Sequence, residues 1–183
     1  MKTPISLGIF LLLAIFVWWS ITENYKDEQM QLAKSKSYVE VFMNEFEILA
    51  MDDNGSPSYI MNGDYLQRHN DSDETEVLKA VFDLLQENGQ WKINADNAII
   101  NDKNDTILLE NNVIMQQQNI EPAVTIRTQQ LLINTRTQIA QTRARVNITQ
   151  GQSLLQSDGM IFNNITSELE LSSNVSGYYV PYD

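Results

Sequence analysis

Cysteine is absent from this chain of 183 residues, which excludes a disulfide framework, a thiolate metal site and a cysteine-linked lipid anchor. The single histidine, His69, has no second imidazole with which to form a metal site, and its polar neighbours indicate a solvated loop side chain. A nucleophile elbow (G-x-S-x-G) and a glycine-rich phosphate loop are also missing. We therefore predict a protein that is not an enzyme and that uses no metal or cofactor.

Positive charge is scarce as well. Lysine and arginine number 12 against 24 aspartates and glutamates, and the formal net charge is −12. No basic stripe compensates for this deficit, so the sequence argues against nucleic acid as a partner. The acidic run at 71–76 lacks the glycine and the distal glutamate of a calcium loop, and we interpret it as a solvated loop. In the long C-terminal part, the arginines are scattered and not clustered with aromatic residues, namely Arg127, Arg136, Arg143 and Arg145.

Charged residues are missing between Lys2 and Glu23, over a stretch of apolar side chains. A helix of this length spans about 30 Å, the thickness of a hydrocarbon core. Trp18 and Trp19 stand at its end, where indoles favour the membrane interface. A cleaved signal peptide is the alternative, but no A-x-A-like site follows. We predict a transmembrane anchor at 1–22, a stalk at 23–37 and an exported domain at 38–183.

Short apolar runs separated by turn signals follow the stalk. Asn-Gly at 88–89 and Asp-Asn-Gly at 53–55 favour turns because Asn and Gly tolerate positive φ. Runs spaced about 8–12 residues apart predict an all-β fold of short antiparallel strands. Residues 74–85 fit an amphipathic helix or a strand pattern, and we favour the strand.

A pattern repeats three times in this domain, and a fixed-period repeat dictates architecture. Within each copy the apolar residues follow one another in steps of two, which is the spacing of side chains on one face of a strand. The three copies start at Ile93, Ile126 and Leu155, and two residues later each has a small side chain, Ala95, Thr128 or Ser157. Five and seven residues after the start come Ala98 and Ile100, Leu131 and Ile133, or Met160 and Phe162. Twenty residues after the start each copy has a valine, Val113, Val146 or Val175.

Stacked copies would place this apolar stripe in one continuous interior. From periodicity alone, the stripe is interpreted as an ordinary core. The alternative is a partly open interior that holds acyl chains, with the small residues Ala95, Thr128 and Ser157 leaving room at a corner of each copy.

The segment from Trp91 to Ala98, followed by Leu109 to Val113, resembles the LptC family, whose members are single-pass inner-membrane proteins of lipopolysaccharide export. Further similarity follows in the right order along nearly the whole chain. Asn111 and Ser157 replace glycines that are usual in the family, and Asn tolerates the left-handed conformation. The other matching elements are Phe46, Gly55 and Tyr59, Thr128 with Leu131, Gly159 with Met160, and Val175 with Gly177 and Tyr179.

The resemblance implies a twisted β-jellyroll in the periplasm, anchored in the inner membrane. Such a domain would receive lipopolysaccharide from an inner-membrane ABC transporter and pass it to a periplasmic bridging protein, and this favours the groove over the solid core. We expect the groove to be lined by Ile93, Ala95, Ala98, Ile100, Leu109, Val113, Met115, Ile126, Leu131, Ile133, Val146, Ile148, Met160 and Phe162.

The two edges of an open jellyroll can pair with neighbouring strands. We expect the N-terminal edge to dock on the transporter and the C-terminal edge to dock on the bridging protein. Two rival functions remain, an anchored carbohydrate-binding or hydrolytic jellyroll and a structural tether of the envelope. The expected docking residues are Val39, Val41, Met43 and Phe46 for the transporter, and Leu169, Leu171, Val175, Gly177 and Tyr179 for the bridging protein.

Overall fold

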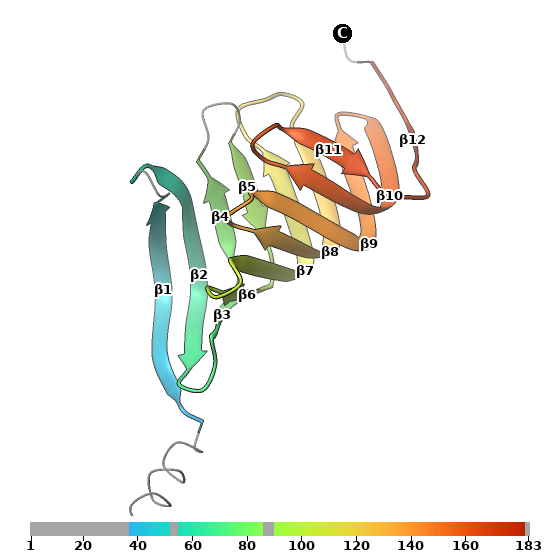
Figure 1. Ribbon diagram of the computed structural model, residues 1–183. Coiled ribbons are helices and arrows are strands. Elements are labelled where there is room, and N and C mark those ends of the chain that lie inside the picture. Colours follow the sequence, from blue (N-terminus) through green and yellow to red (C-terminus); the bar gives the residue numbers. More distant parts are fainter. Residues whose placement is uncertain (1–36, 52–54, 86–89, 182–183) are drawn as a thin grey trace, which may run out of the picture. The chain divides into compact units, whose positions relative to one another are not determined.

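A computed structural model describes residues 37–51, 55–85 and 90–181 (Figure 1). The predicted anchor and nearly all of the predicted stalk lie outside these residues. Among the described residues, no helix has the length and apolar character needed to cross a membrane.

Twelve strands form the described part of the chain, which confirms the all-β prediction. Residues 74–85 form two short strands with a sharp turn between them, so the strand interpretation of this segment is confirmed. The strands are β1 (Val39–Met51), β2 (Pro57–His69), β3 (Glu74–Leu78), β4 (Val81–Leu84), β5 (Trp91–Asn94), β6 (Asn97–Asn101), β7 (Thr106–Gln117), β8 (Val124–Asn134), β9 (Ile139–Gln150), β10 (Ser153–Asn163), β11 (Glu168–Leu171) and β12 (Ser176–Tyr178).

The sheet bends over on itself and makes two layers, because its long strands take part in both. β2 pairs with β4 at 59–62 and with β3 at 65–68. β7 pairs with β6 at 106–110 and with β5 at 114–117. We call the layer that contains β4, β5 and β12 the first layer, and the layer that contains β3, β6 and β11 the second layer. β8, β9 and β10 cross from one layer to the other (Figure 1).

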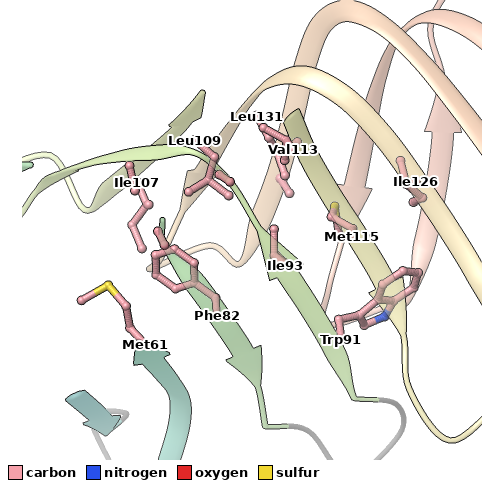
Figure 2. Packing of buried hydrophobic residues seen from close by; sticks show 14 of the residues in the cluster. Met61, Phe82, Trp91, Ile93, Ile107, Leu109, Val113, Met115, Ile126 and Leu131 are labelled. Carbon is pink, nitrogen blue, oxygen red and sulfur yellow. The ribbon is translucent and has the colours of Figure 1, made fainter. Parts of the chain in front are cut away.

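An unbroken row of directly paired apolar residues crosses the first layer, and a shorter one crosses the second. Members of such rows face the same side of the sheet and pack on one another. Figure 2 shows Met61, Phe82 and Ile93 on neighbouring strands, with Ile107 on the other layer. The first row is Ile48, Met61, Phe82, Ile93, Met115, Ile126, Ile148 and Leu155, and the second row is Ile100, Ile107, Ile133, Ala140, Phe162 and Leu169.

The bend between the layers is built from irregular pairing at one level of the sheet. Register shifts occur there between Glu110 and Val113 and between Asp158 and Met160. Asn111 and Asn112 have φ of 62° and 50°, which supports the expectation that Asn can serve at this turn. Gly159 has φ 99°, and a Cβ there would lie 3.0 Å from the carbonyl oxygen of Thr142.

Polar side chains stabilise the first part of this bend, where β3 is followed by β4 and β5 by β6. Lys79 and Asn112 both donate hydrogen bonds to the Asp96 carboxylate, and we call these three residues the polar clamp. In the same place the backbone amide of Lys79 donates to the carbonyl of Asp96, and that of Ala95 donates to the carbonyl of Ala80. The hydrogen bond from Lys79, and then that from Asn112, lowers the pKa of Asp96 below its usual value. The copies of the repeat differ here: β5 and β6 of the first copy are separate strands, whereas the corresponding segments of the second and third copies are the continuous strands β8 and β10.

Acid should weaken the fold through the polar clamp. Because the pKa of Asp96 is lower in the folded chain, its stabilisation is present above the unfolded pKa and is lost as pH falls through the folded pKa. We expect the wild type to unfold at higher urea than Asp96→Asn at pH 7, and the two midpoints to converge on acidification. A difference between the midpoints that does not change with pH would contradict this.

Two leucines that face the interior provide a matched test of packing. Leu109 is 0% exposed and Leu169 is 37% exposed. We expect Leu109→Ala to lower the free energy of unfolding by about 2–5 kcal/mol, because it leaves a cavity in a closed part of the core. Leu169→Ala should cost much less. Equal losses in urea titrations of the two variants would show that the interior is not closed around Leu109.

Candidate functional site

A cleft of about 900 Å³ lies between the two rows and has an apolar floor. Phe82, Ile93 and Met115 line it from the first row, and Ile107 and Phe162 line it from the second. Both rows face the interior because strand side chains alternate, so the cleft is the part of the interior that the two layers do not fill. Its size falls within the usual range for small-molecule sites.

Aromatic rings border the cleft. Trp91 of the first layer and Phe162 of the second meet edge to face, with ring centroids 5.4 Å apart, so they bridge the two layers. Tyr59 and Phe82 are tilted against each other with centroids 5.9 Å apart. Burial, with a contribution from the Asp102 carboxylate, raises the pKa of Tyr59, so its phenol is neutral at physiological pH.

The two rims of the cleft differ in polarity. One rim consists of apolar or uncharged residues near the β1–β2 and β4–β5 connections. The other consists of the turns between strands of the second layer. Three of these turns are built alike, since the side-chain oxygen of Asn101, Asn134 or Asn163 accepts a hydrogen bond from the amide three residues on. The apolar rim contains Ala50, Met51, Pro57, Ser58, Leu84 and Leu85, and the polar rim contains Asp105, Asn134, Thr135, Arg136, Gln138, Asn164 and Ser167, with Ile165 as its one apolar residue among those described.

The groove residues expected from the sequence all face the interior, but they fall into two groups. Ile93, Met115, Ile133 and Phe162 line the cleft. Ile100 is partly buried and packs on the core without lining the cleft. The remaining residues are buried in the packed core, namely Ala95, Ala98, Leu109, Val113, Ile126, Leu131, Val146, Ile148 and Met160.

Several cleft residues were not among the groove residues expected from the sequence. Tyr59 and Phe82 lie before the repeat, and only their register with Leu84 and Ile93 brings them to the cleft. Ile107 belongs to the apolar stripe of the repeat, fourteen residues after its start and two before Leu109, but it was not counted among the expected groove residues. The polar rim could have been found from the asparagine that starts each turn, eight residues after the start of each copy.

The expected docking residues occupy opposite ends of the strand order. β1 pairs with β2 and with no other described strand, and on it Val39 is exposed, Val41 and Met43 are partly buried, and Phe46 is packed in the core. At the other end β11 and β12 both pair with β10. There Leu169, Val175, Gly177 and Tyr179 are exposed and Leu171 packs on the core.

The described residues contain no group of three or more potential metal ligands, and the cleft offers bulk apolar contact with a polar margin. Such a site suits an amphiphile, whose tails would meet the floor and whose head would meet the polar rim.

No curated protein matches the chain. A family model described as "LptC: Lipopolysaccharide-assembly, LptC-related" matches residues 8–180, nearly the entire sequence. This is a transport family, not a known enzyme family, which disfavours the hydrolytic alternative. The chain therefore belongs to the LptC family, and its function is in lipopolysaccharide transport in the cell envelope.

Proposed function

We propose that the protein is a membrane-anchored periplasmic carrier that accepts lipopolysaccharide from an inner-membrane ABC transporter and passes it to a periplasmic bridging protein. Residues 1–22 would anchor it, 23–37 would form the stalk, and 38–183 would carry the lipid. The observation that carries this proposal is the apolar cleft between the two rows, in a chain that belongs to a lipopolysaccharide-assembly family.

The physical need for such a cleft follows from the acyl chains. Each CH₂ group is stabilised by about 0.8 kcal/mol when it leaves water, so a lipid with several chains does not cross an aqueous space unaided. A cleft lined by Ile93, Ile107 and Ile133 would shield part of these chains without any chemical step. The described residues show no nucleotide-binding loop, so the energy for transport would come from the transporter.

Strand pairing would connect the carrier to its two partners. The outer edge of β1 offers backbone groups to a strand of the transporter, close to Val41 and Met43. The burial of Phe46 is compatible with this role, because strand addition uses the backbone. At the other end, β11, β12 and the exposed Val175 and Tyr179 would form the surface for the bridging protein.

Photo-crosslinking tests the carrier function. A photoreactive residue at Ile133 or Phe162, which line the cleft, should capture lipopolysaccharide in cells that carry an active transporter. The same residue at Lys103, whose side chain is 71% exposed, should not. Capture at Lys103 alone would contradict the proposal. Without ATP hydrolysis by the transporter, capture at both cleft positions should fall.

Gly177 tests the C-terminal docking surface. A Cβ at this position would lie 2.3 Å from the carbonyl oxygen of Leu154, so Gly177→Ala must displace β12 from β10. We expect binding of the bridging protein to weaken about tenfold or more, equivalent to ~1.4 kcal/mol, while the transporter still co-purifies with the protein.

The neighbouring variant Ser176→Ala is the control, because it keeps the backbone pairing of β12 with Gln156. It should bind both partners as the wild type does. Loss of both partners in Gly177→Ala would indicate misfolding and would remove the support for two separate docking edges.

A further inference from the structure

Charge is distributed unevenly around the cleft. Among the described residues that line it, Arg136 is the one cation and Asp105 is the one anion, and both belong to the polar rim. The facing rim, from Ala50 to Leu85, carries no charge among its described lining residues. A ligand with one charged end and one apolar end would therefore be oriented by this cleft.

Arg136 is displayed on an ordered turn. The Asn134 side chain accepts a hydrogen bond from the Thr137 amide at 2.8 Å, and the Asp105 carbonyl accepts one from the Thr135 amide at 2.8 Å. These bonds fix the backbone on both sides of Arg136. Its side chain remains 78% exposed, so the guanidinium is accessible from solvent at the margin of the cleft.

The guanidinium is already engaged by a carboxylate. Nη2 of Arg136 lies 2.6 Å from Oδ2 of Asp105, and the Asp105 side chain is 31% exposed. Exposed ion pairs contribute little to stability and exchange partners at small cost. Arginine presents a planar fork of N–H donors that matches the oxygens of a phosphate, and this pairing is often bidentate.

We propose that Arg136 binds a phosphate group on the head of the transported lipid and that Asp105 competes with this phosphate for the guanidinium. This inference rests on the proposed function and adds a residue that sets the orientation of the lipid: the phosphorylated sugar lies on the polar rim and the acyl chains lie on the apolar floor. Asp105 keeps Arg136 neutralised between binding events, and so limits capture of other anions.

The two partners of the ion pair give opposite predictions. The full-length chain in detergent is titrated with phosphorylated lipid A and with the same lipid after enzymatic removal of its phosphates. Arg136→Gln should lower affinity for the phosphorylated form about tenfold, to that of the dephosphorylated form. Asp105→Asn should raise affinity for the phosphorylated form, because the guanidinium loses its competitor. Neither variant should change binding of the dephosphorylated lipid.

Arg143→Gln is the matched control, since Arg143 is an exposed arginine of β9 that does not line the cleft. It should bind both lipids as the wild type does. Equal wild-type affinity for the two lipids, or equal losses in Arg136→Gln and Arg143→Gln, would overturn the proposal for Arg136. Displacement of the lipid by inorganic phosphate at similar concentration would assign the site to free phosphate instead. Failure of the wild type to bind either lipid would count against the carrier function itself.

Discussion

The whole domain depends on keeping one side of a bent sheet apolar from its first strand to its last. A strand turns alternate side chains to opposite faces, so a shift of one residue exchanges the inner and outer sets. β8 makes this shift at the bend, where its inward residues change from Ile126 and Thr128 to Leu131 and Ile133. β10 makes it between Ser157 and Met160. β7 and β9 keep the same alternation through the bend, with Leu109 and Val113, and Thr142 and Val146, facing inward. In β8 and β10 the irregularity at the bend therefore lets one strand serve both layers without bringing polar side chains into the interior.

Much of this arrangement could be predicted, because the repeat encodes the inward side directly. The small residue at the corner and the apolar pairs around it predicted the interior stripe, and the spacing of the short apolar runs predicted the all-β class. Periodicity could not distinguish which stripe residues line a cleft and which are packed solid. That distinction depends on how far apart the two layers lie at each position. Ile93 and Leu109 are both fully buried, but Ile93 lines the cleft and Leu109 lies in the closed core.

The parts of the site that were not predicted come from long-range pairing. Tyr59 and Phe82 reach the cleft because β2 and β4 join the first layer next to β5. The polar rim forms because equivalent turns of successive copies stack, which places Arg136 beside Asp105 although 31 positions separate them. Leu155 shows that a position in the repeat does not by itself predict burial. It starts the third copy and belongs to the first row, yet it remains 37% exposed because the row ends there and its next neighbour is Gly177, which has no side chain.

The part of the first row that lines the cleft has a kinetic consequence for the proposed transport. Phe82, Ile93 and Met115 stand on neighbouring strands of the first layer, spaced by about 4.8 Å, and each presents an apolar side chain to the cleft. A fatty chain that advances by one strand along the cleft would exchange one apolar neighbour for another, so its free energy would change little from step to step. A surface of this kind has no deep trap, and it favours rapid sliding over tight retention.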